Sequence, residues 1–132
     1  MPEKETLERA RKDRKAGKSA STQAGEFVRE EIHHIREGKH GAKSAKQAIA
    51  IGLSKARRAG VNLKAPEKGE TSEKTRRSAQ RALAAGKKHK AVSPKRSRAM
   101  SEKLKHEGHS AASHRALSRQ AHSAARTRAK SN

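Results

Sequence analysis

Residues 20–63 read ASTQAGEFVREEIHHIREGKHGAKSAKQAIAIGLSKARRAGVNL and hold most of the large apolar side chains of the chain. A helix is predicted in the first half of this stretch, from a cap at Ser21 or Thr22 to about Glu37, with Gly38 as its end. The apolar residues of that half share one side of a helical wheel, as in an amphipathic helix that faces a core. They are Ala24, Phe27, Val28, Ile32 and Ile35.

A second helix is predicted over residues 45–59, after a short loop. Ser44 and Gln47 have the spacing of a capping box, in which the serine caps the helix and the glutamine reaches back to a free backbone N–H. Gly60 followed by Val61 is typical of a Schellman ending. The two helices form an expected hairpin, whose predicted core is Phe27, Val28, Ile32, Ile35, Ile49, Leu53, Ala56, Val61 and Leu63.

Gly52 lies inside the second helix, where a glycine costs about 1 kcal/mol relative to alanine. Either another helix approaches closely at this point, or the glycine is merely tolerated. The hairpin core is also small for a stable unit of this length. A homodimer through the 20–63 hairpin, or a third helix supplied by residues 72–85, would enlarge it.

The composition of the whole chain limits what else can fold. Its 132 residues carry 34 Lys and Arg against 13 Asp and Glu, a formal net charge of +21, and Val, Ile, Leu and Phe together number only 14. Chains of this kind are usually disordered. The predicted fold is therefore all-α: a small hairpin of two or three helices at 20–63, a charged segment at 1–19, and a long, basic, partly disordered Ala/Lys/Arg-rich tail at 64–132.

Three pieces of the tail have helix-forming composition, and they are 72–85, 94–107 and 111–129. Thr71 can cap the first, with Gly86 as its end, while Ser93 with Pro94 can start the second. Ser110 or Ser113 can start the third. We expect these pieces to become helical when their charge repulsion is relieved.

The charge of the tail is the strongest functional signal. Residues 74–132 contain 17 Lys and Arg and only two acids. A polyanion with a phosphate backbone is the natural counter-charge, because each neutralised phosphate releases a condensed counterion. A merely solubilising tail is the alternative. The predicted nucleic-acid-binding residues are Lys39, Lys43, Lys46, Lys55, Arg57, Arg58, Arg76, Arg77, Arg81, Lys87, Lys88, Lys90, Lys95, Arg96, Arg98, Arg115, Arg119, Arg126 and Arg128.

Aromatic residues are nearly absent, since Phe27 is the only one. Unpaired bases are usually stacked on aromatic side chains, so duplex DNA is favoured over RNA as the partner. The segment Ser93-Pro94-Lys95-Arg96 is similar to minor-groove motifs of basic tails, but it is explained at least as well as a helix start. A helix-turn-helix with residues 45–59 as recognition helix is a weaker alternative, because the preceding loop is long.

Other function classes find little support. There is no cysteine, no Gly-rich phosphate loop and no nucleophile with a base and an apolar pocket, so neither an enzyme nor a cofactor is expected. Glu30, His33, His34 and Glu37 have the spacing of one helix face and could bind a divalent metal, although a solvated polar face explains them more simply. No apolar run or export signal is present, which predicts a cytoplasmic protein without a membrane contact.

The stretch from Gly25 to Val61 resembles a family of small basic bacterial proteins of unknown function, and KQAIAIGLSKARRAG at 46–60 is its most specific part. Members of that family are often labelled DNA-binding or plasmid-stabilisation proteins. The resemblance implies a bacterial origin and brings no assigned functional residues.

Together these observations predict a DNA-binding accessory or nucleoid-associated protein that contacts the phosphate backbone with little sequence specificity. One alternative is a factor that binds structured RNA or the ribosome. Another is a protein-interaction module, of the antitoxin or plasmid-stabilisation kind, whose basic tail only localises it.

Overall fold

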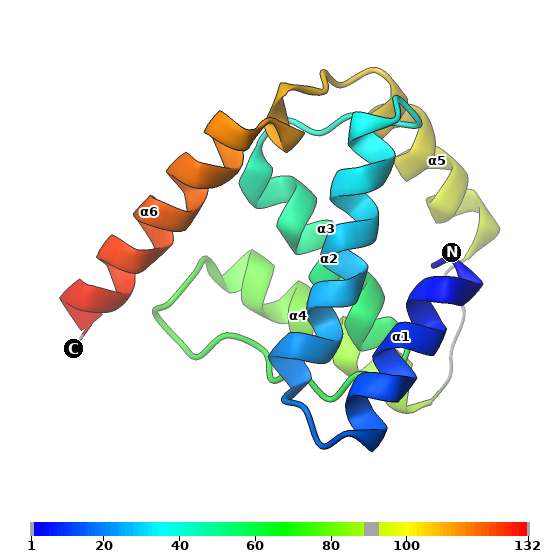
Figure 1. Ribbon diagram of the computed structural model, residues 1–132, viewed down its shortest axis with the longest axis vertical. Coiled ribbons are helices and arrows are strands. Elements are labelled where there is room, and N and C mark those ends of the chain that lie inside the picture. Colours follow the sequence, from blue (N-terminus) through cyan, green and yellow to red (C-terminus); the bar gives the residue numbers. More distant parts are fainter. Residues whose placement is uncertain (1, 89–92, 132) are drawn as a thin grey trace.

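A computed structural model describes residues 2–88 and 93–131. Within these ranges every element of regular secondary structure is a helix. In chain order the elements are α1 (Lys4–Lys15), α2 (Ala20–Arg36), α3 (Ala45–Arg58), α4 (Glu73–Lys87), α5 (Pro94–Lys105), the 3-10 turn η1 (Ser110–Ala112) and α6 (His114–Ser131). The first four helices, η1 and the loop before α3 form a packed body, from which α6 extends to the C-terminus (Figure 1).

The predicted hairpin is present as α2 and α3. Ser19, rather than Ser21 or Thr22, caps α2, because its Oγ accepts from the backbone N–H of Thr22 at 3.2 Å. The capping role of Ser44 at the start of α3 is confirmed by a bond of 3.1 Å from the N–H of Gln47. The Gln47 side chain accepts from the N–H of Lys43, one residue earlier than a standard capping box.

Gly52 of α3 lies against the backbone of α2. A Cβ atom at this position would be 2.6 Å from Cα of Val28, a distance that van der Waals contact does not allow. Of the two explanations that the sequence leaves open for Gly52, close approach is the one that the structure shows, and the two helices come together where a side chain is missing.

The prediction of a two- or three-helix hairpin with a partly disordered tail is wrong. The tail contributes α4, α5, η1 and α6, and three of these, α4, η1 and α6, contact the hairpin. The helix α4 begins after a Ser72 cap, not after Thr71, and continues past Gly86 to Lys87. Gly86 is needed inside the helix because a Cβ there would lie 1.9 Å from the carbonyl oxygen of Arg57.

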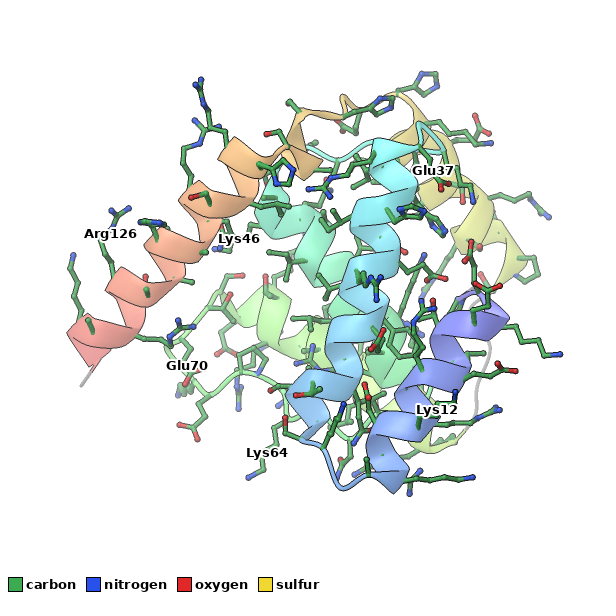
Figure 2. The ribbon with its side chains drawn as sticks, viewed as in Figure 1. Lys12, Glu37, Lys46, Lys64, Glu70 and Arg126 are labelled. Carbon is green, nitrogen blue, oxygen red and sulfur yellow. The ribbon has the colours of Figure 1, made fainter. Side chains whose placement is uncertain are left out.

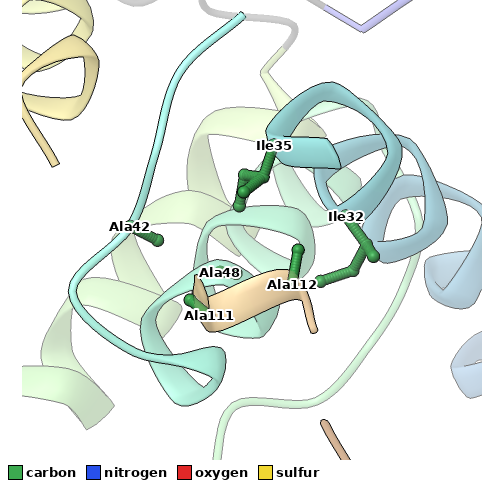
Figure 3. Close-up of a cluster of buried hydrophobic side chains, with 6 residues drawn as sticks. All are labelled: Ile32, Ile35, Ala42, Ala48, Ala111 and Ala112. Carbon is green, nitrogen blue, oxygen red and sulfur yellow. The ribbon is translucent and has the colours of Figure 1, made fainter. Parts of the chain in front are cut away.

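Alanine explains why the tail folds. One buried cluster joins α2, the loop after it, α3 and η1, and consists of Ile32, Ile35, Ala42, Ala48, Ala111 and Ala112 (Figure 3). Arg36 adds a bond from its Nε to the carbonyl oxygen of Ala112, at 2.9 Å. A count of large apolar residues misses this core, because small side chains are fully buried when helices approach closely.

A second cluster joins α1 to the hairpin, and consists of Ala10, Ala24, Phe27, Ala56 and Val61. Arg9 of α1 and Glu26 of α2 reinforce this contact with an ion pair of 3.0 Å. The Schellman ending predicted at the end of α3 places Val61 in this cluster, since its N–H is bonded to the carbonyl oxygen of Ala56 at 3.0 Å. The charged N-terminal segment is thus part of the packed body.

The last two helices are attached through few residues. Leu104 is the one buried residue of α5, and its carbonyl oxygen accepts from the N–H of Gly41 at 2.8 Å. Ser93 caps α5 with Pro94 in its first turn, and Ser113 caps α6, both as predicted. Residues 114–130 of α6 include no fully buried side chain; Ala116, Leu117, Gln120 and Ala124 are half-buried along one side, and the other residues of 114–130 are exposed.

Candidate nucleic-acid interface

A groove of about 740 Å3 separates the start of α3 from α6. Four of the predicted DNA-binding residues line it: Lys43 and Lys46 on the α3 side, and Arg119 and Arg126 on the α6 side. Figure 2 labels Lys46 and Arg126, one from each side. The other lining residues are Ser44, Ala45, Ser110, Ala111, Ala116, Ser118, Gln120, His122 and Ser123. No carboxylate lines the groove among the residues that the structure describes, so its lysines and arginines have no acidic neighbour in that lining.

The α3 side of the groove is the N-terminus of a helix. Lys43 and Lys46 are exposed, and neither has an ion pair with a described residue. The unpaired backbone N–H groups of the first turn add a partial positive charge that favours anions. Two cations and the N-terminus of α3 therefore line the same wall of the groove.

The α6 side carries a stripe of four Lys and Arg side chains and one histidine, which we call the α6 stripe. Its members, spaced by four, three, four and four residues, are Arg115, Arg119, His122, Arg126 and Lys130. At 100° per residue this spacing keeps them within an arc of about 80° and extends them over about 22 Å of helix. The stripe borders the groove and continues beyond it on the exposed part of the helix.

Ion pairing is unequal between the two halves of the molecule. Residues 3–55 hold most of the ion pairs, whereas α4 and α5 hold only those made by Glu73 and Glu102. No member of the α6 stripe pairs with a carboxylate among the described residues, and α6 itself contains no acid. Its charge is uncompensated and available to an external anion.

Two of the predicted residues serve the fold instead. Arg57 is only 7% exposed, and its guanidinium donates to the carbonyl oxygens of Leu63 at 3.1 Å and Lys64 at 2.9 Å. Burial lowers the pKa of Arg57 from its ordinary value. Lys55 forms an ion pair with the buried carboxylate of Glu31. Neither side chain is free to meet a phosphate, so both are left out of the interface.

The other predicted cations lie elsewhere on the surface. Lys39 lies between Glu3 and Glu37, with its Nζ 3.6 and 3.4 Å from their carboxylate oxygens. Desolvation lowers the pKa of Lys39, but the two carboxylates raise it by more, so the pKa is above its ordinary value. The other predicted binding residues that the structure describes do not line the groove. They are Arg58, Arg76, Arg77, Arg81, Lys87, Lys88, Lys95, Arg96, Arg98, Arg115 and Arg128. Lys90 lies outside the described residues.

The predicted metal-binding set does not converge. His33 and Glu37 form an exposed pair at 2.5 Å on one side of α2. Glu30 is buried and accepts from the Oγ1 of Thr6 at 3.2 Å. His34 lies 3.0 Å from Glu3, and this hydrogen bond is the main cause that lowers the pKa of the Glu3 carboxyl. The four residues therefore form two separate groups, an exposed pair and a pair beside the start of α1.

Of the described lining residues that the list of predicted binding residues omits, His122 is the one with an ionisable side chain. Its spacing of three residues after Arg119 and four before Arg126 is visible in the sequence and could have indicated it. The sequence cannot predict the opposite wall of the groove, because Lys46 lies 68 positions before the start of α6 and Lys43 lies 71 positions before it.

Comparisons with family models, with curated proteins and with solved structures found no match to this chain. The resemblance to small basic bacterial proteins therefore stays a prediction. Among the described residues, no helix combines the length and the apolar character needed to cross a bilayer.

Proposed function

We propose that this protein binds duplex DNA through the phosphate backbone, with little sequence specificity, in the groove between α3 and α6 and along the α6 stripe. The observation that carries the proposal is the convergence of Lys43, Lys46, Arg119 and Arg126 on one groove with no carboxylate in its described lining. A surface of this kind attracts polyanions, and binding gains free energy from the counterions that it releases.

The shape of α6 suits a duplex. An α-helix is about as wide as the major groove of B-DNA, and the α6 stripe is about 22 Å long, so it can run beside several successive phosphates. Between the cations α6 has alanine and serine, whose small side chains allow the backbone to approach DNA closely. Gln120 is the only side-chain amide in the described lining of the groove, so one residue there is suited to bidentate recognition of adenine, and the other polar side chains are cations, hydroxyls and one imidazole that can bind phosphates.

The proposed binding unit is one chain. The reason for expecting a homodimer was the small core of the hairpin, and α1, α4 and η1 enlarge that core within the chain. A protein of this kind would be found wherever duplex DNA is concentrated, which in a bacterial cell is the nucleoid.

A salt titration tests the mechanism. Six cations belong to the groove and the α6 stripe: Lys43, Lys46, Arg115, Arg119, Arg126 and Lys130. If they neutralise six phosphates, the logarithm of the affinity for a duplex should fall against the logarithm of salt concentration with a slope of about −5 or steeper. An affinity that does not depend on salt would overturn the proposal.

The double variant R119Q/R126Q should weaken binding to all duplex sequences alike and make the slope shallower by about 2. The control is K12Q/K15Q, which removes the same charge from exposed positions of α1 that do not line the groove. Equal losses in the two variants would show attraction to net charge alone. Stronger competition by folded ribosomal RNA than by duplex DNA would favour the RNA-binding alternative.

A further inference from the structure

Two imidazoles and a buried carboxylate meet where α2 runs into the loop before α3. Glu31, His34 and His40 each offer a ligand atom, and these atoms lie within 4.8 Å of one another. The side chain of Glu31 is only 1% exposed, and those of His34 and His40 are 12% and 15% exposed. The cluster is thus formed inside the protein rather than on a solvated helix face.

The proton on His40 can be placed from its surroundings. Its Nδ1 lies 3.0 Å from the carbonyl oxygen of Gly41, which can only accept a hydrogen bond, so Nδ1 carries a proton. In the neutral ring Nε2 then has a lone pair, which faces Oε2 of Glu31 at 3.1 Å. Two acceptors face each other at this distance only when a cation or a second proton lies between them.

When His40 is neutral, this same atom of Glu31 has no hydrogen-bond donor among the described residues. Its Oε2 is buried without a hydrogen-bond partner among the described residues, whereas its Oε1 is paired with Lys55. A buried acceptor left without a partner costs about 1–3 kcal/mol. One oxygen of this carboxylate is therefore paired with the Lys55 ammonium, and the other faces His40 without a hydrogen-bond donor.

The separation of the His40 and Glu31 ligand atoms fits a transition-metal site. With Zn–N and Zn–O bonds of about 2.0 Å, neighbouring ligand atoms of a tetrahedral zinc ion are about 3.3 Å apart, close to the separation of the His40 and Glu31 atoms. The hydrogen bond from Nδ1 of His40 to a backbone carbonyl is the outer contact that usually orients a metal-bound histidine.

A second set of donors adjoins the first. Glu3, Glu30 and His34 also present ligand atoms within 4.8 Å of one another, and Oε2 of Glu30 is buried without a hydrogen-bond partner among the described residues. His34 belongs to both groups. A further ligand from this side, or a water molecule, can complete the coordination of an ion held by the first three residues.

We propose that Glu31, His34 and His40 bind one divalent transition-metal ion, with Zn²⁺ as the representative ion. The ion would fix the loop that contains His40 to α2 and so support the backbone of Gly41 and Ala42, to which the end of α5 is attached. This site is separate from the DNA-binding groove, and the proposal does not depend on DNA binding.

The test is a titration of the metal-free, full-length protein with Zn²⁺ by calorimetry and with Co²⁺ by visible absorption. We expect one saturable site, with the absorption of cobalt in a tetrahedral nitrogen and oxygen environment. The variants H34Q and H40Q should lower the affinity at least tenfold. The matched control is H33Q, which removes an exposed imidazole from the same helix, and it should bind as the unchanged protein does.

Absence of a saturable site in the unchanged protein would overturn the proposal, as would an equal loss of affinity in H33Q. If H34Q or H40Q does not fold, imidazole nitrogen NMR signals of the unchanged protein decide the matter. Addition of Zn²⁺ should shift the ring signals of His34 and His40 and leave those of His33 in place, whereas the reverse pattern would assign only adventitious surface binding.

Discussion

A Cβ atom on Gly52 would lie 2.6 Å from Cα of Val28, so α2 and α3 meet backbone to backbone. The contact allows alanines to fill the space beside the crossing, where Ala24, Ala48 and Ala56 are fully buried. The whole fold depends on this closeness, because few residues of the chain are large enough to span a wider gap.

The first prediction concerns this contact. Gly52→Ala should lower the free energy of unfolding by about 1–3 kcal/mol, although alanine normally favours a helix, because the added methyl group forces the helices apart. Chemical denaturation followed by circular dichroism measures the change. The control is Gly25→Ala in α2, where a Cβ meets nothing within 4 Å, and which should stabilise the protein by about 0.5–1 kcal/mol.

A second prediction separates structural arginines from binding arginines. Arg57→Leu should lower the free energy of unfolding by about 1–3 kcal/mol, because the carbonyl oxygens of Leu63 and Lys64 lose their donors. Arg119→Gln should leave stability nearly unchanged and weaken DNA binding. Thermal melts and DNA titrations of both variants provide the measurement, and a stable Arg57 variant with a binding defect would contradict this assignment.

The two faces of α6 give a third prediction. Arg126 belongs to the α6 stripe and lines the groove, whereas Arg128 lies two residues further on, about 200° around the helix, and does not line it. Arg126→Gln should make the salt dependence of DNA binding shallower by about one phosphate contact, and Arg128→Gln should have a smaller effect. Identical effects of the two substitutions would mean that α6 does not present one face to DNA.

The fourth prediction concerns the C-terminal half. A fragment of residues 1–66 lacks Ala111 and Ala112, which belong to one buried cluster. It also lacks α4, whose Gly86 packs against the backbone at the end of α3. It should unfold at lower temperature and with less cooperativity than the full chain in a circular dichroism melt. Hydrogen exchange offers a local check, since the N–H groups of Gly41 and Ala42 are bonded to Leu104 and Gly108 only in the full chain. A fragment as stable as the full chain would show that the hairpin is an independent unit.

The parts of the fold that the sequence predicts well are those with local causes. Serines at 44, 93 and 113 cap helices in the way their spacing to the next free N–H predicts. The apolar periodicity of 20–63 gives both helices of the hairpin nearly to the residue. The folding of the tail could not be predicted in this way, because Ala111 and Ala112 become core residues only through contact with Ile32 and Ile35, which are far away in the chain.

The candidate sites show the same division. The spacing of the α6 stripe is a local property of the sequence, but its pairing with Lys43 and Lys46 depends on where α6 leaves the body. The helical spacing of Glu30, His33, His34 and Glu37 indicated metal ligands on one face, yet the donors that converge include Glu31 and a loop residue, His40. Helical spacing alone cannot place a ligand from a loop.

The amino-acid sequence by itself determined the helical hairpin and the large positive charge, because periodicity, caps and charge are properties of neighbouring residues. Only the tertiary structure decided which alanines are core and which cations remain free. Arg57 and Arg126 have the same side chain, but one donates to backbone carbonyls inside the protein and the other faces an open groove. That difference arises from the packing of segments distant in the chain.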